Sequence, residues 1–454
     1  MAKKLWGGRF KKEIDKDFFE FQKSIQYDYK LAQYDIYHSR IHTSALRDAG
    51  ILKNDEWKKL SLALKEISNE IEKGEFRPDF DSEDIHTDIQ NAIEKKVGAL
   101  ALKLHTLRSR NDQIAFDERW YCILKSLDII ITTFNLCKSL VLQAKNNFWH
   151  KFIGYTHTQR AQVILFFDYL YTFSKMFTRD AERLTRFHEN LFIYIGAGAL
   201  TGSALSRRNY DKAIKELSLF KKAHRVNIIK PSDDPLDNVS DRDFIIEFLS
   251  ILSIMQMHLS RLAEDLILYS TKEFNFIDLP EEFCTGSSLM PHKKNPDFLE
   301  LVRGNTGKVY GNLMSLLTTM KGLPLTYNRD MQLDKEPLFS SVEVVEAELK
   351  IMAKFIKGIK LNTKVIEKAL EDESLYATDL AEFLVYKGVP FKEAHTLVGK
   401  LVRDAYDKNK KIKEMEDKEL KQYHSALNKT IIQKVMNAEY SVKSKKTFVR
   451  KIPK

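Results

Sequence analysis

The sequence predicts an all-α protein of three helical domains, with a central bundle of long helices. Glycine and proline number only 17 and 10 among 454 residues, so the chain has few turns and long elements. Three long stretches contain neither residue; they are 99–153, 155–195 and 240–279. We expect an N-terminal domain at 1–108, a central long-helix bundle at 109–360 and a small C-terminal domain at 361–454.

One of these stretches, 240–272, predicts a single helix about 50 Å long at roughly 1.5 Å per residue. Its first residues, Ser240 to Asp243, are typical of a capping box. Apolar residues then recur at three- and four-residue steps, at Ile245, Leu249, Leu252, Met255, Leu259, Leu262 and Leu266. Further apolar residues widen this surface beyond one stripe. The helix therefore needs cover on several sides, and we expect a bundle built from several subunits.

The composition describes a soluble globular protein, with 43% hydrophobic and 30% charged residues. The most apolar stretch, 244–268, contains five charged or histidine side chains, which we interpret as too many for a membrane span. Residues 1–10 lack the apolar core of a signal peptide. The net charge of +10 is spread along the chain, apart from a cluster at 443–454. We expect a solvated surface that attracts anionic substrates, with no nucleic-acid or membrane partner.

The three cysteines, Cys122, Cys137 and Cys284, are far apart in the chain. Their spacing is not that of a metal site and indicates a reducing compartment, so we expect a cytoplasmic protein. Cys284 lies beside the loop discussed next, where a small buried side chain is a better interpretation than a nucleophile.

The stretch 285–296 carries the densest polar chemistry in the chain. Two prolines exclude an ordinary helix, so the stretch predicts a loop. Hydroxyls lie at one end, and two lysines and an amide at the other. Such a loop suits an anionic substrate, in which Lys293 or Lys294 holds a carboxylate, Asn295 orients it, and a serine reaches the reacting carbon.

The spacing of Gly286, Ser287, Met290, Lys293 and Asn295 resembles the signature loop of the fumarate-forming lyases, a family that includes aspartase, class II fumarase, adenylosuccinate lyase and argininosuccinate lyase. The extended loop, 284–297, is most similar to that of the argininosuccinate lyases, and the resemblance covers nearly the whole chain. It implies elimination of argininosuccinate to arginine and fumarate, and no metal or organic cofactor. It also implies a homotetramer whose active sites are shared between subunits.

The resemblance assigns the catalytic acid and base to Ser287 and His157, and we prefer Ser287 as the base. Lys293, with Asn295 and Thr156, would stabilise the dianionic intermediate. Glu300 would pair with His157 and tune it. These residues are expected to surround the carbon atoms that react.

The block 154–162 contains Thr156 and His157. Gly154 is expected to break a helix there, so that both residues lie at the start of the next one. Taken alone, His157 is more often a capping or packing histidine than a catalytic one. Val163 stands where the family has proline.

Substrate contacts are implied first by the block 105–113. Two arginines two positions apart, followed by an amide, suit bidentate binding of a dicarboxylate. The resemblance makes Arg110 and Asn111 substrate contacts. Leu107 stands where the family usually has glycine, and its side chain would crowd the site or shift the loop.

Two other blocks complete the expected substrate site. Ser24 resembles a serine that touches substrate, although taken alone it would be a helix cap. In the block 322–336, Tyr327, Gln332 and Lys335 resemble residues that bind the amino-acid end of argininosuccinate. Arg242 faces the site or pairs with its acidic neighbours, and both interpretations stay open.

Other features have several interpretations. His86 is a structural histidine or a base. The glycine-rich run 195–203 lacks a Gly-Lys-Ser/Thr ending, and no strand is evident before it, so it predicts a turn rather than a nucleotide site. The nearest alternative function is adenylosuccinate lyase or another fumarate-forming lyase. A second is an inactive structural protein similar to delta-crystallin, which Leu107 and Val163 keep open.

Overall fold

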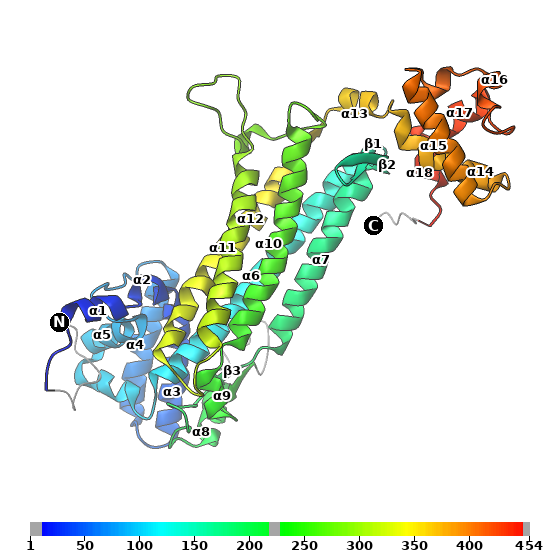
Figure 1. Ribbon diagram of the computed structural model, residues 1–454. Coiled ribbons are helices and arrows are strands. Elements are labelled where there is room, and N and C mark those ends of the chain that lie inside the picture. The colour runs from blue at the N-terminus through cyan, green and yellow to red at the C-terminus, as the bar shows by residue number, and fades with distance from the viewer. Residues whose placement is uncertain (1–10, 218–227, 448–454) are drawn as a thin grey trace. The chain divides into compact units, whose positions relative to one another are not determined.

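The computed structural model describes residues 11–217 and 228–447, and these form an all-α protein with a few short strands (Figure 1). Residues 1–10 and the end of the charged cluster at 443–454 lie outside the described residues. The chain divides into two compact units, described here one at a time. Unit 1 contains the described residues of 1–131, 180–256 and 305–346, and unit 2 those of 132–179, 257–304 and 347–454. The three predicted domains remain a prediction.

Unit 1 packs short helices around α3, which contacts α4, α5 and α8 (Figure 1). Its helices are α1 Lys16–Gln22, α2 Ile25–Asp28, η1 Tyr29–Leu31, α3 Ala32–Asp48, α4 Asn54–Glu72, α5 Ile85–Val97, η2 Gly98–His105, α8 Arg207–Glu216, α9 Pro235–Ser240 and η5 Arg329–Asp334. Its strands β3 Ile193–Ile195 and β4 Ile229–Pro231 pair in parallel.

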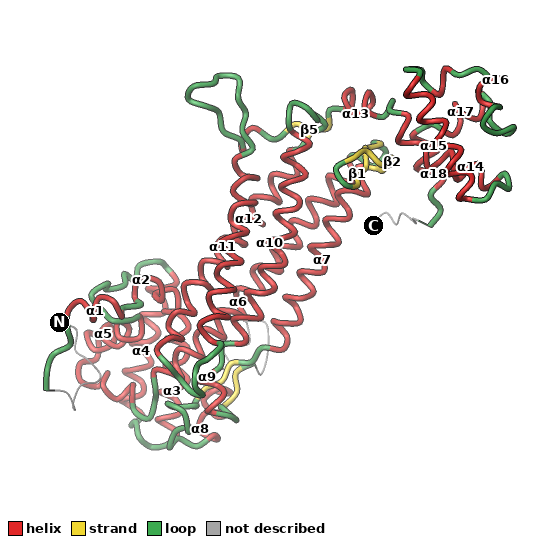
Figure 2. The backbone as a smooth tube through the Cα atoms, in the orientation of Figure 1, coloured by secondary structure: helices red, strands yellow, loops and turns green. Residues whose placement is uncertain are grey.

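Unit 2 contains two antiparallel strand pairs and the C-terminal helices (Figure 2). The strands are β1 Lys151–Thr156, β2 Gln159–Leu165, β5 Ile277–Asp278 and β6 Lys360–Leu361. The helices are η4 Glu281–Phe283, α13 Thr363–Ala369, η6 Glu373–Tyr376, α14 Ala377–Tyr386, α15 Phe391–Asp407, η7 Ile412–Glu414, α16 Asp417–Leu420, α17 Lys429–Val435 and α18 Ala438–Ser444. Near the end of the chain, Lys445 pairs with the buried Asp379 at 2.8 Å.

The long helices contribute residues to both units. They are α6 Arg110–Asn146, α7 Phe166–Asn190, α10 Asp243–Ser270, α11 Asp297–Met320 and α12 Lys335–Gly358. Scarcity of glycine and proline therefore predicted α6, α7 and α10, although these helices end inside the predicted stretches because loops also occur in sequences without glycine or proline. Helices α11 and α12 lie outside those stretches and contain glycine or proline.

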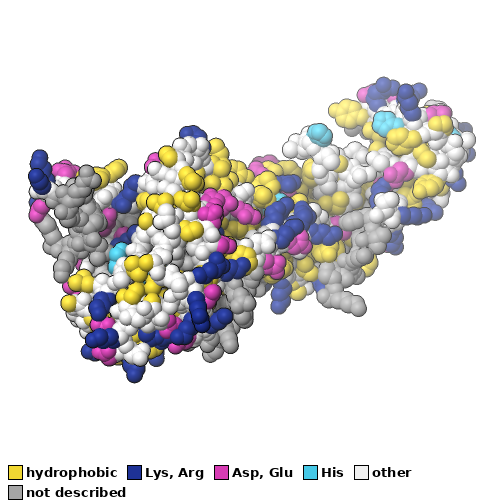
Figure 3. All heavy atoms as spheres, turned by 90° about the horizontal axis from the view of Figure 1, so that it is seen from below, with side chains coloured by type: hydrophobic (Ala, Val, Ile, Leu, Met, Phe, Trp, Pro, Cys, Tyr) yellow, Lys and Arg dark blue, Asp and Glu magenta, His cyan; other side chains and the backbone are white. Residues whose placement is uncertain are grey.

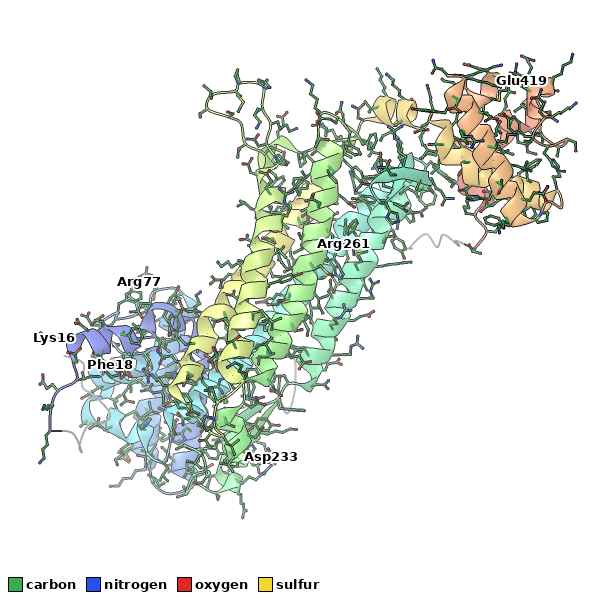
Figure 4. The ribbon with its side chains drawn as sticks, in the orientation of Figure 1. Lys16, Phe18, Arg77, Asp233, Arg261 and Glu419 are labelled. Carbon is green, nitrogen blue, oxygen red and sulfur yellow. The ribbon has the colours of Figure 1, made fainter. Side chains whose placement is uncertain are left out.

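Helix α10 confirms the predicted apolar periodicity. Its seven periodic residues, from Ile245 to Leu266, are all fully buried. The helix begins at Asp243 and not at Ser240, which ends α9. The Asp241 carboxylate accepts hydrogen bonds from the backbone N–H groups of Arg242 and Asp243, so Asp241 caps this end. The charged Arg261 is an exposed side chain of α10 (Figure 4).

By length and composition alone, α6 and α10 are apolar enough to cross a membrane. The expectation that the charges of 244–268 exclude a membrane span therefore does not hold. In the most apolar window of α10, 61% is buried inside the protein, and the corresponding share of α6 is 50%. Buried core helices of soluble proteins have the same composition. On the face drawn in Figure 3, positive and negative side chains are interspersed, as on a solvated surface.

The block around His157 is a β-hairpin, so the predicted helix start is wrong. Strands β1 and β2 pair antiparallel, and His157 and Thr158 form the connecting turn with φ of 51° and 58°. Two central residues with positive φ are typical of a type I′ turn, which matches the twist of its strands. Val163 pairs with Ile153 in this hairpin. The β-branched residues of the two strands favour this pairing over a helix.

The glycine-rich run is preceded by the short strand β3, which the sequence did not reveal. Gly196, Gly198 and Gly202 have positive φ values. The backbone N–H groups of Gly196 and Ala197 donate to the Asp112 carboxylate at 3.0–3.2 Å. These donors therefore bind a carboxylate of the same unit, and the run is the predicted turn.

Candidate active site

The signature loop is closed at its base by backbone pairing. Thr285 and Asn295 exchange N–H···O hydrogen bonds of 3.2 and 2.8 Å. The Thr285 hydroxyl also donates to Asp297 at the start of α11, at 2.7 Å. The loop extends beyond that end of α11 (Figure 2). Residues 286–294 are therefore held at their base by the contacts of Thr285 with Asn295 and Asp297, while the middle of the loop faces solvent.

Ser287 occupies a turn within this loop. Its Oγ accepts hydrogen bonds from the backbone N–H groups of Leu289 at 3.2 Å and Met290 at 3.0 Å. Donors aimed at an oxygen stabilise its anionic form. The local backbone therefore stabilises the alkoxide of Ser287, which is the form in which a serine can accept a proton.

The two lysines of the loop have different environments. Lys294 Nζ is 2.8 Å from Asp278 Oδ1 and also donates to the carbonyl of Leu279 at 2.5 Å. Lys293 is exposed and has no ion pair with any described residue. Of the two lysines, Lys293 is thus the one whose ammonium is not held by a described carboxylate, and its binding of a substrate carboxylate stays a prediction. The Asn295 amide donates to Gly286 O at 3.4 Å, which places it across the loop base.

Thr156 and His157 are both exposed at the tip of the hairpin. Because no helix begins there, neither residue belongs to a helix N-terminus. Glu300 is exposed in the first turn of α11. Among the described residues of one chain, Glu300 and His157 form no ion pair, so their predicted pairing stays a prediction.

In unit 1, predicted substrate contacts lie at the starts of α2 and α6, and both places contact residues at the start of α5. Ser24 is buried, and its hydroxyl donates to Asp28 at 2.6 Å, so it does not cap α2 through its side chain. Asp28 also accepts from the N–H of Ile85, at the start of α5. Burial, and then the charge of Asp84, raise the pKa of Asp28 above its ordinary value.

Arg110 begins α6 and is 3.1 Å from Asp84 Oδ1. Asn111 donates to the carbonyl of Ala199 at 3.2 Å. Leu107, in the turn before α6, has φ of +58°, a left-handed conformation that glycine adopts without strain. Its side chain is 41% exposed, so within the chain it does not crowd its neighbours. The backbone conformation explains why glycine suits this position.

The block 322–336 places its three predicted residues in different environments. Gln332 donates to the carbonyl of Gln22 at 2.8 Å. Lys335 is 2% exposed, with Nζ 2.8 Å from Glu118 and 2.9 Å from Asp334. Burial raises the pKa of the Tyr327 hydroxyl, and the Lys335 charge opposes that shift, so the two side chains are neighbours.

The sequence did not single out four residues that interact with the predicted substrate-binding residues: Tyr27, Asp28, Glu118 and Asp334. Tyr27 and Asp28 follow Ser24 within four residues, so the sequence around Ser24 was a usable signal. Glu118 gave no signal, because its partners Arg242 and Lys335 are distant in sequence, whereas Asp334 lies beside Lys335 in the block 322–336. His86, left open, is buried, with Nδ1 3.0 Å from Asp35 Oδ1 and 3.7 Å from Asp117, which makes it part of a buried network.

Comparison with known proteins identifies the family. A family model described as "Lyase" matches residues 8–311, and one described as "Argininosuccinate lyase C-terminal" matches residues 374–443. The chain is 42% identical to the argininosuccinate lyase of Caldanaerobacter subterraneus over 449 residues, 98% of each chain. It is 43% identical to that of Hydrogenobaculum sp. over 450 residues, 98% of this chain and 94% of the other.

Solved structures share the fold at lower identity. An EDDS lyase in complex with formate has a TM-score of 0.78 at 22% identity, and the match covers 93% of this chain and 83% of the EDDS lyase chain. The class II fumarase of Schistosoma mansoni has a TM-score of 0.76 at 15% identity, with 92% and 91% covered. With the full-length identity above, these findings show that the chain belongs to the argininosuccinate lyase family.

Proposed function

We propose that the protein catalyses the reversible elimination of argininosuccinate to arginine and fumarate, the reaction that completes arginine biosynthesis. The observation that supports this most directly is the signature loop. It presents Ser287 with two backbone N–H donors on its Oγ and an unpaired Lys293 six positions later. Base and cation for an anionic substrate are thus available on one segment.

In this proposal Ser287, in its alkoxide form, accepts the proton from the carbon beside a substrate carboxylate and becomes a neutral hydroxyl. The electron pair moves into that carboxylate and gives a dianionic aci-carboxylate. The C–N bond then breaks, and a proton passes to the leaving guanidino nitrogen, with His157 as the acid. Backbone donation from Leu289 and Met290 lowers the cost of the serine oxyanion. Closure of the loop over substrate would exclude water and strengthen these hydrogen bonds.

The dianion needs fixed positive charge and hydrogen-bond donors that are in place before reaction. Lys293 supplies the charge, and Asn295 and Thr156 supply donors. Lys294 serves the loop, since its ammonium is held by Asp278 and Leu279 O. The substrate group of unit 1, with Ser24, Arg110, Asn111, Tyr327, Gln332 and Lys335, binds the remaining parts of argininosuccinate.

A homotetramer with active sites shared between subunits is part of the proposal. On α11, a Cβ added at Gly307 or Gly311 would meet no atom within 4 Å. Met314 and Leu317, at helical spacing from these glycines, are 60% and 40% exposed. A helix face with small residues beside exposed apolar ones allows close packing of a second helix, and a second copy of the chain would supply it. We place this assembly in the cytoplasm.

Fumarate absorbance tests the function. Purified protein is mixed with argininosuccinate in one cuvette and adenylosuccinate in another. We expect an increase with argininosuccinate alone. An increase with adenylosuccinate alone would keep the reaction type and reject the substrate, whereas a folded tetramer that releases fumarate from neither would reject the proposed activity.

A further inference from the structure

Four charged side chains form a closed group inside unit 1, beside the proposed binding residues. They are Glu118 of α6, Arg242 between α9 and α10, Asp334 at the end of η5, and Lys335 at the start of α12. Each is at most 2% exposed. Two carboxylates face two cations, so the group is neutral when all four are charged. A buried ion group without water has to satisfy its own hydrogen bonds.

The geometry is alternating. Arg242 Nε lies 2.7 Å from Asp334 Oδ2 and 3.1 Å from Glu118 Oε2. Lys335 Nζ lies 2.9 Å from Asp334 Oδ1 and 2.8 Å from Glu118 Oε1. Each carboxylate therefore uses one oxygen for the arginine and the other for the lysine. Arg242 holds the carboxylate oxygens that do not contact Lys335, and the other two oxygens hold the Lys335 ammonium.

An ammonium has three N–H donors, and the two carboxylates take two of them. The third is left for another acceptor near Lys335. Burial raises the pKa of the Tyr27 and Tyr327 hydroxyls, and the Lys335 charge opposes the shift at both, so both tyrosines are near enough to feel the ammonium. In the predicted amino-acid subsite, one N–H of Lys335 is therefore available to a substrate carboxylate.

The two carboxylates hold Lys335 unequally. Although burial raises it, Lys335 and Arg242 together keep the pKa of Asp334 below its ordinary value. Burial, and then the charge of Asp334, raise the pKa of Glu118. Asp334 is therefore the more stable anion of the two, and Glu118, on another helix, is the second carboxylate in contact with the Lys335 ammonium, at 2.8 Å.

We propose that Glu118, supported by Arg242, is a positioning residue that aims the Lys335 ammonium at the carboxylate of the substrate's amino-acid end. This inference rests on the proposed function, because it deepens the role of Lys335 in that site. Neither Glu118 nor Arg242 reaches the substrate. Their effect passes through Lys335 and concerns binding of the arginine half, not proton transfer at the carbon atoms that react.

The test compares Glu118→Leu with Glu118→Gln in the full-length enzyme. Leucine removes the acceptor at similar volume, and we expect KM for argininosuccinate to rise about tenfold or more with kcat within about threefold, because misplacement of a binding group weakens binding without touching the acid and base. Glutamine keeps an oxygen for the ammonium and should restore most of the affinity. In a Lys335→Met background, Glu118→Leu should add no further increase in KM.

Asp379→Leu is the matched control. Asp379 is a buried carboxylate that also pairs with a lysine, Lys445, at 2.8 Å, and it belongs to unit 2. It should lower stability and leave KM unchanged. If Glu118→Leu does not fold, Arg242→Lys keeps the charge but loses the planar fork, and it should raise KM about threefold or more.

A folded Glu118→Leu or Arg242→Lys enzyme with unchanged KM would overturn the inference and leave the proposed function intact. An inactive wild type would reject the proposed function. Calorimetric binding of arginine then decides the inference separately, since Glu118→Leu has to weaken arginine binding by a similar factor. Equal arginine affinity in the two proteins would overturn it.

Discussion

The backbone N–H of Met290 points at Ser287 Oγ across 3.0 Å, and the N–H of Leu289 joins it at 3.2 Å. The oxygen proposed to take the carbon proton is therefore already surrounded by donors in the free chain. This local geometry predicts more than the loss of activity on removing the serine. It predicts an environment that stabilises any anion placed there.

A thiol in that position should be unusually acidic. In Ser287→Cys, the two N–H groups stabilise the thiolate and lower its pKa. Burial raises the pKa of the natural Cys284 thiol nearby. We expect iodoacetamide to alkylate Cys in Ser287→Cys at lower pH than in Ser288→Cys, the matched control, as followed by mass spectrometry. Equal rates for the two variants would show that the turn does not stabilise an anion.

Substitution of the two loop lysines should lower kcat/KM by different factors. Lys293→Met removes the free ammonium, and we expect kcat/KM to fall by about 100-fold or more, because a preorganised cation at the dianion is lost. Lys294→Met removes a cation held by Asp278 and should cost less than tenfold in kcat/KM. Steady-state fumarate release measures both. A larger loss in Lys294→Met would reverse the assignment.

Leu107 should be a site of backbone strain. A non-glycine residue at φ of +58° costs about 1 kcal/mol, which glycine avoids. We expect Leu107→Gly to raise the free energy of unfolding by up to about 1 kcal/mol in urea titrations. Leu102→Gly, at an exposed leucine of η2 without positive φ, is the control and should lower it. Equal destabilisation by both substitutions would contradict the strain.

Acid should destabilise the fold through His105. Burial, and then the charge of Arg108, lower the pKa of His105 from 6.5 to about 4. Between these values the unfolded chain binds a proton that the folded chain does not, so stability falls as pH drops from 6.5 to about 4. His105→Gln should reduce the loss between pH 7 and pH 5 in urea midpoints. The exposed His395→Gln is the control, and identical slopes in both variants would refute the assignment.

Sequence patterns predicted the parts of the fold that depend on local spacing. The three- and four-residue steps of α10 gave its buried face, from Ile245 to Leu266, because helical geometry alone relates those positions. The hairpin at 151–165 was missed because Gly154 was interpreted as a break between two helices, and the residues on either side of it permit helix and strand equally. Only the positive φ values at His157 and Thr158 distinguish the turn, and these are not visible in the sequence.

The candidate site likewise contains residues that local spacing indicates and residues that only long-range contacts reveal. Ser287 and Lys293 were predicted from the spacing within one loop, and their roles stay predictions. The choice between Lys293 and Lys294 required the position of Asp278, which lies on another segment. The group around Lys335 joins residues 118, 242, 334 and 335, and no local pattern relates the first two of these to Lys335. Long-range pairing of this kind follows from the fold alone.

The most direct test of the account is the turnover of Ser287→Ala beside Ser288→Ala, with argininosuccinate binding measured for both. We predict that Ser287→Ala lowers kcat by about 1000-fold or more while the substrate still binds, because the base is lost and the binding groups remain. Ser288→Ala should retain most of the wild-type rate. A Ser287→Ala enzyme with a near-normal rate would contradict the account, since the loop serine would then not take the carbon proton.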